Sequence, residues 1–206
     1  MQLIFNIDLP KPPSEVLSEV LDIGTNRYND PTIRQHIVGY PGEVELGTDP
    51  FDRRNRRRRN LDTEKGIYAR VAPTQTLKEF VYSILPDYNL TDDLIGIQTT
   101  INRHFPHTDR FYSRLIYRVS GEPATTVWFV EKGHELVRDS GLAFLDYDVP
   151  TLDQVGSGVL ENGNWYLLIA NVIHGVMDNK DKRISITIPM DEWQANKLIQ
   201  EHSKVD

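Results

Sequence analysis

The chain has 206 residues, a formal net charge of −7 and no cysteine, with 39% hydrophobic and 26% charged residues. These values are ordinary for one soluble globular domain over residues 1–206, and the lack of cysteine excludes disulfides, metal–thiolate centres and thiol nucleophiles. The negative charge argues against nucleic acid as the main partner, although the six arginines between Arg53 and Arg59 leave that partner open. No apolar run is long enough to span a membrane and no signal peptide is recognisable, so we expect no membrane partner and a cytoplasmic location.

The first 93 residues combine one expected strand, two expected helices and a long irregular stretch. Alternating apolar residues over 3–7 predict the strand, and apolar residues at helical spacing predict a helix from Ser14 that stops at Gly24. Residues 26–62 are rich in Pro, Gly, Asp and Arg, so we expect an irregular excursion or lid. A second amphipathic helix is expected over 74–85, where Pro86 ends it.

Beyond residue 93 the pattern changes to short apolar runs separated by turns. The expected strands are 94–103, 114–119, 125–131, 142–147, 164–175 and 183–189. Strands of this length and spacing are typical of an antiparallel sandwich or barrel. A C-terminal helix is expected after Asp191 as its cap, with Trp193, Leu198 and Ile199 on its apolar face. The pattern predicts a mainly β (α+β) domain in which helices cover one sheet, but it does not separate a jelly-roll from other sandwiches.

Three short motifs carry the chemistry of this half of the chain. They are His107-Thr108-Asp109, His174 at 67 residues further on, and Arg183-Ile184-Ser185 at nine positions after that histidine. Two imidazoles and one carboxylate can bind one face of a metal ion and leave the other face open. Within a strand, residues i and i+2 point to the same side, so His107 and Asp109 can reach one ion. His104 is an alternative partner for His107, but residues three apart in a strand face opposite sides.

This motif set resembles the 2-oxoglutarate/Fe(II)-dependent dioxygenase family, whose signature is HxD, a distal histidine and a following arginine in an RxS pattern. The resemblance covers roughly residues 94–190. It implies a double-stranded β-helix, or jelly-roll, with supporting N-terminal and C-terminal helices. Residues 94–190 would then form the catalytic core, and residues 1–93 a helical and irregular support or lid.

The resemblance also implies a role for each motif residue. His107, Asp109 and His174 would be the catalytic ligands of Fe(II), and Arg183 with Ser185 would bind the C5 carboxylate of 2-oxoglutarate, assisted by Thr187. Tyr117 would lie near the same carboxylate. With O2, such an enzyme hydroxylates a C–H bond and releases succinate and CO2; a carboxylate at Asp109 favours hydroxylation over halogenation. The substrate would be a small molecule or a protein side chain.

Two other functions fit parts of the same pattern. The first is a cupin-like metal protein that binds or isomerises a small acid without 2-oxoglutarate. The second is a non-catalytic binding module that uses the arginine run, which we otherwise interpret as a solvated loop. Arg183 alone is typical of a surface cation in an ordinary strand, and His174 nine residues earlier is what favours cosubstrate binding. The oligomeric state and the substrate are not indicated by any motif.

Overall fold

The computed structural model describes residues 2–27, 34–39, 67–101, 104–109, 111–133, 149–176 and 181–203. Within these ranges the chain forms two antiparallel sheets and three α-helices. The strands are β1 (Ile4–Ile7), β2 (Arg34–Gly39), β3 (Ile67–Val71), β4 (Gly96–Ile101), β5 (His104–His107), β6 (Ser113–Ser120), β7 (Ala124–Glu131), β8 (Leu152–Leu160), β9 (Trp165–Ile169), β10 (His174–Val176) and β11 (Arg183–Met190). The helices are α1 (Ser14–Asp22), α3 (Gln75–Ile84) and α4 (Glu192–His202).

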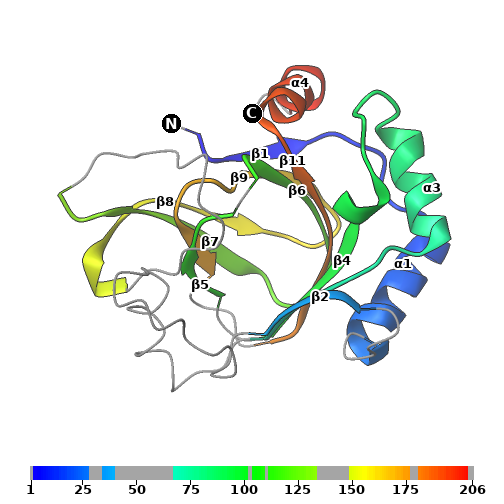
Figure 1. The fold of residues 1–206 in the computed structure, drawn as a ribbon, viewed down its shortest axis with the longest axis horizontal. Helices are drawn as coiled ribbons and strands as arrows, with labels where there is room; N and C mark the ends of the chain where they lie inside the picture. The colour runs from blue at the N-terminus through cyan, green and yellow to red at the C-terminus, as the bar shows by residue number, and fades with distance from the viewer. Residues whose placement is uncertain are drawn as a thin grey trace, which may run out of the picture.

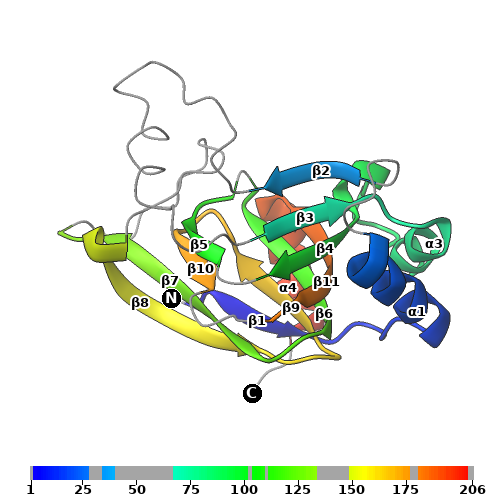
Figure 2. The ribbon, with the colours of Figure 1, turned by 90° about the horizontal axis from the view of Figure 1, so that it is seen from below.

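The strand order is that of a double-stranded β-helix. One sheet runs β1-β9-β6-β11-β4-β3-β2 and the other runs β5-β10-β7-β8. From β4 to β11 the chain passes repeatedly between the two sheets, and Figures 1 and 2 show these sheets stacked as a sandwich. The predicted mainly β jelly-roll with supporting helices is therefore confirmed.

The three helices pack on the outer face of the seven-stranded sheet. In Figure 1, α1 and α3 lie side by side on one flank, and α4 lies near β1 and β11. Alternate residues of β11 point into this layer, where Ile184, Ile186 and Ile188 are buried with Val20 of α1 and Leu77 of α3. This alternation follows from the period of two in a strand, and it leaves the other residues of β11 facing the opposite sheet.

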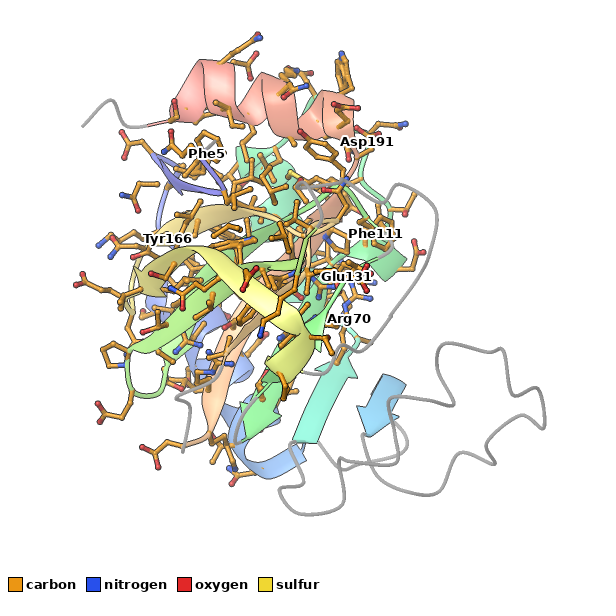
Figure 3. All side chains as sticks on the ribbon, turned by 90° about the vertical axis from the view of Figure 1, so that its left-hand side faces the viewer. Phe5, Arg70, Phe111, Glu131, Tyr166 and Asp191 are labelled. Atoms are coloured by element: carbon orange, nitrogen blue, oxygen red, sulfur yellow. The ribbon has the colours of Figure 1, made fainter. Side chains whose placement is uncertain are left out.

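The inner faces of the two sheets meet in a second apolar cluster. Ile116, Tyr166 and Leu168 of the larger sheet pack there against Trp128 and Leu160 of the smaller sheet. Figure 3 shows side chains of both sheets filling the space between them. Trp128 also donates its indole N–H to the carbonyl oxygen of Ile169 at 3.0 Å, which ties β7 to the end of β9.

The starts of α3 and α4 follow the sequence signals closely. The Thr74 hydroxyl accepts the backbone N–H of Leu77 at the start of α3. Asp191 and Gln194 form a reciprocal capping box at the start of α4. Figure 3 labels Asp191 at this end of the helix. The expected apolar face of α4 is partly wrong, because Trp193 is 61% exposed while Leu198 is fully buried. No helix in the described ranges has the length and apolar character to cross a bilayer.

The α-helix α1 ends at Asp22, with Gly24 directly after its C-cap Ile23 as predicted, but Gly24 does not end the helical path of the chain. The chain continues beyond α1 as a π-helical turn, η1 (Ile23–Arg27). A Cβ atom at Gly24 would lie 2.6 Å from the side chain of Ile184, and the carbonyl oxygen of Gly24 accepts the hydroxyl of Thr99. Glycine is needed here because the turn approaches the sheet closely, and not because the helix ends.

Several strands differ from the predicted ones. Residues 26–62 were expected to be irregular, yet β2 pairs with β3 inside and beside this stretch. Strand β8 was also missed, because Asp153, Gly156, Ser157 and Gly158 are typical of a loop. Its backbone is paired along its length with β7 at the edge of the smaller sheet. The predicted strand 142–147 and the arginine run 53–59 lie outside the described residues.

One predicted strand is divided in two. Residues 164–175 give β9 and β10, which belong to different sheets, and residues 170–173 carry the chain from one sheet to the other. The apolar run continues through this crossover because residues 170–173 are themselves buried, so hydrophobicity alone does not mark the break. The predicted strand 94–103 is shorter in the structure, where β4 covers Gly96–Ile101.

Candidate metal centre

His107, Asp109 and His174 converge between the two sheets. One ligand atom of each lies within 4.8 Å of the others, and the exposed fractions of the three residues are 2%, 3% and 8%. His107 Nε2 lies 3.6 Å from Asp109 Oδ1. His107 and His174 are directly opposite on β5 and β10, with ring centroids 4.4 Å apart. Residues distant in the sequence therefore meet because antiparallel pairing brings these two strands together.

The ring of His174 is oriented by its own backbone. Nδ1 lies 2.9 Å from the carbonyl oxygen of Val172, which can only accept, so Nδ1 carries the proton and Nε2 keeps its lone pair. Burial lowers the pKa of His174, and this effect outweighs the opposing influence of Asp109 and of the Val172 hydrogen bond. A neutral imidazole with a fixed tautomer is the form that binds a metal ion.

Arg114 holds Asp109 as a carboxylate. Its Nε and Nη2 atoms approach the same oxygen, Oδ2, at 2.8 and 2.5 Å, which leaves Oδ1 facing His107. Burial alone would raise the pKa of Asp109, but the charge and the hydrogen bond of Arg114, with the electrostatic influence of the two nearby imidazoles, together lower it. The carboxylate is therefore both ionised and directed before any cation binds.

The position of Asp109 differs from the simple strand argument. Strand β5 ends at His107, so Asp109 lies just past it and does not continue the ladder. Its backbone N–H donates to the carbonyl oxygen of Ala170 at 2.9 Å, which ties it to the crossover before β10. The two residues still face one ion, but a loop hydrogen bond and the Arg114 ion pair set the position of the carboxylate.

The predicted cosubstrate residues of β11 lie on its inner side. Arg183, Ser185 and Thr187 alternate with the isoleucines that face the helices, and all three are buried. Ser185 accepts a long hydrogen bond of 3.3 Å from Nη1 of Arg118 on β6, its partner in register. The hydroxyl of Thr187 is buried and has no hydrogen-bond partner.

Tyr117 is not brought to this group. It packs on Trp165 with ring centroids 5.0 Å apart, within the cluster that the helices cover, so it faces away from Ser185. Its neighbour Arg118 occupies the inner face instead, because a shift of one residue in a strand reverses the side. The sequence analysis did not single out Arg114 and Arg118. Both alternate along β6 with the apolar residues Leu115, Tyr117 and Val119, and this period-two pattern could have placed the two arginines on one face of the strand. The side chain of the alternative ligand His104 lies outside the described residues.

The donor set suits a divalent transition metal. Two neutral imidazoles and one monodentate carboxylate with no thiolate are the protein ligands of non-haem Fe(II) centres with open positions. Metal–nitrogen bonds of about 2.1 Å hold neighbouring ligands about 3 Å apart, so the observed group is slightly wider than a bound set. To hold one ion, the three ligand atoms would have to move closer together by this difference.

Comparisons with known proteins give fold likeness only. No protein-family profile and no curated protein matches the sequence. The structure is similar to AviO1 from Streptomyces viridochromogenes Tue57, with 12% identity over 89% of this chain and 88% of that one and a TM-score of 0.40. It is also similar to E. coli ycfD, with 15% identity over 71% of this chain and a TM-score of 0.39, and spans 36% of ycfD. A cupin-like protein from Thermotoga maritima MSB8 gives 10% identity over 63% and 73% of the two chains and a TM-score of 0.29.

Proposed function

We propose that this protein is an Fe(II)- and 2-oxoglutarate-dependent dioxygenase that hydroxylates a C–H bond of a small molecule or protein side chain. The observation that carries the proposal is the buried convergence of His107, Asp109 and His174 on one point between the sheets. The order and spacing of these three residues in the sequence do not by themselves bring them together in space. Their convergence in the structure is therefore separate support for a shared metal ion. A chance HxD would have no reason to face a histidine 65 residues beyond Asp109.

The chain's own residues fit the two parts of such a centre. His107, Asp109 and His174 would hold the iron, and Arg114 keeps the carboxylate charged and aimed at it. Arg183 and Ser185, on the inner side of β11, would bind the C5 carboxylate of the cosubstrate. When bound, iron and 2-oxoglutarate supply the oxidation of the C–H bond by O2, with succinate and CO2 as products. Buried apolar residues such as Trp128 and Ile116 keep bulk water from part of the space between the sheets.

A second candidate is a cupin-like metal protein that binds or isomerises a small acid without 2-oxoglutarate. The metal triad and the inner-face arginines serve this function equally well, because both attract a carboxylate to a bound cation. The displaced Tyr117 favours it slightly, since one predicted cosubstrate contact is missing. The two candidates differ in whether 2-oxoglutarate itself is bound and consumed.

The experiment is an anaerobic titration of the purified protein with Fe(II) and then 2-oxoglutarate. A weak visible metal-to-ligand charge-transfer band that saturates at one cosubstrate per chain is the expected result. On admission of air, the complex should form succinate slowly even without a substrate. Metal-loaded protein that shows neither the band nor succinate would falsify the dioxygenase proposal and leave the cupin-like candidate. The Arg183→Ala variant sharpens the choice, because only the dioxygenase loses cosubstrate binding while it keeps its metal.

A further inference from the structure

Arg118 is a buried cation that no acidic side chain in the described residues neutralises. Its exposed fraction is 3%. Nη1 donates to the hydroxyl of Ser185 at 3.3 Å and Nη2 donates to the carbonyl oxygen of Glu122 at 3.4 Å, while Nε has no acceptor. Both bonds are longer than the usual 2.7–3.2 Å range for N–H···O. The guanidinium is therefore held in place without the strong partners that a buried charge normally has.

The contrast with Arg114 on the same strand is direct. Arg114 has the carboxylate of Asp109 as its partner, and two of its nitrogens contact one oxygen. Arg118 lies four residues further along the same face of β6, a backbone separation of about 13 Å. Burial lowers the pKa of Arg118 to about 10, which still leaves it charged at neutral pH. Strand β6 therefore carries one arginine that is paired with a carboxylate at the metal triad, and a second arginine further along without such a partner in the described residues.

Hydroxyl groups on the inner side of the neighbouring strand β11 can act as donors to a ligand of Arg118. Ser185 accepts the Nη1 bond with its oxygen, so its own hydroxyl proton is available. Thr187, two residues on and on the same side of β11, has a buried hydroxyl with no partner. A planar guanidinium next to hydroxyl donors matches a carboxylate, which accepts several hydrogen bonds in one plane. The ligand that fits is an acid whose far end carries a carboxylate and whose near end reaches the metal triad.

We propose that Arg118, together with Ser185 and in addition to Arg183, binds the far carboxylate of 2-oxoglutarate and determines the selectivity for it over 2-oxo acids that lack this group. The inference rests on the proposed function, because it names the residue that distinguishes the cosubstrate. A purely structural Arg118, held only by Ser185 and Glu122, would affect folding but not the choice between acids.

The test compares two ligands of equal carbon number, 2-oxoglutarate and 2-oxovalerate, by calorimetric titration of Mn(II)-loaded protein. The wild type should bind 2-oxoglutarate more tightly. Arg118→Gln should weaken 2-oxoglutarate binding by about 10- to 100-fold, the effect of losing a charged hydrogen bond, and leave 2-oxovalerate binding unchanged. Arg118→Lys keeps the positive charge but loses the planar, two-pronged guanidinium, so it should weaken 2-oxoglutarate binding less than Arg118→Gln does. If Arg118→Gln does not fold, Arg118→Lys is compared with the wild type in its place. Lys182→Gln, which removes a charge outside the inner face, is the control and should bind both acids as the wild type does.

The possible results distinguish the role of Arg118 from the dioxygenase function itself. Equal binding of 2-oxoglutarate by the wild type and both Arg118 variants would overturn the role of Arg118 and leave the dioxygenase proposal intact. The same conclusion follows if Arg118→Gln weakens the binding of 2-oxoglutarate and of 2-oxovalerate to the same extent. If the wild type takes up Mn(II) but does not prefer 2-oxoglutarate over 2-oxovalerate, both the assignment of 2-oxoglutarate as cosubstrate and the role of Arg118 are overturned.

Discussion

The two faces of the seven-stranded sheet use the same strands for different purposes. On the outer face, Ile184, Ile186 and Leu115 pack with the helices in a largely apolar layer. On the inner face, the alternating residues of β11 and β6 are Ser185, Thr187, Arg114 and Arg118, which are equally buried but polar or charged. Burial of apolar side chains on the outer face stabilises the fold. Burial on the inner face instead leaves polar groups without full hydrogen bonding, such as Arg118, or holds them in one direction, such as Asp109 beside Arg114.

The largest expected effect comes from removing a metal ligand on the inner face. His174→Ala should lower the affinity for Mn(II) or Fe(II) by more than about 100-fold, since even residues that merely orient ligands cost 10- to 100-fold. Equilibrium dialysis with Mn(II) measures this loss. His202→Ala, which removes a half-buried histidine at the end of α4, is the matched control and should bind metal normally. Unchanged affinity in His174→Ala would place the metal elsewhere.

An outer-face change should alter stability without touching the site. Ile186→Ala opens a cavity in the layer under the helices and should lower the free energy of unfolding by about 2–5 kcal/mol. Chemical denaturation measures the loss, and Mn(II) affinity measured in parallel should match that of the wild type. A drop in metal affinity as large as that of His174→Ala would mean that the two faces are not separate.

Arg114→Met tests whether the inner-face charges depend on one another. Without metal, the buried carboxylate of Asp109 loses its partner, and the variant should be less stable by about 3 kcal/mol. Bound Mn(II) should restore much of this stability, because a cation then neutralises Asp109. Denaturation in EDTA and in excess Mn(II) gives both values. An equal loss in the two conditions would contradict the coupling of Arg114 to the metal through Asp109.

The smallest effect should have the opposite sign. Thr187 carries a buried hydroxyl without a partner, so Thr187→Val should stabilise the ligand-free protein by about 1 kcal/mol. The same change should weaken 2-oxoglutarate binding a little, because a donor beside Ser185 is lost. Thermal unfolding with and without the cosubstrate measures both. Destabilisation of the free protein would show that the hydroxyl is already satisfied, for example by water.

The sequence predicts the convergence at the metal triad better than the details around it. HxD and a distal histidine specify residue types whose meeting depends only on β5 and β10 being partners, and that pairing is present. The face of Tyr117 was not predictable from the resemblance, because β6 is buried on both sides and one residue decides which side chain faces inward. Strand β8 was hidden by its glycines, since it is defined by pairing to β7 and not by its own apolar pattern.

We infer that His107, Asp109 and His174 hold one metal ion between the sheets, and crystals grown with Mn(II) and measured at the manganese absorption edge can locate that ion. We expect one strong anomalous peak within bonding distance of two imidazole nitrogens and Oδ1 of Asp109, with Oδ2 still held by Arg114. If the anomalous peak of protein saturated with Mn(II) lies anywhere else, these three residues are not the metal site.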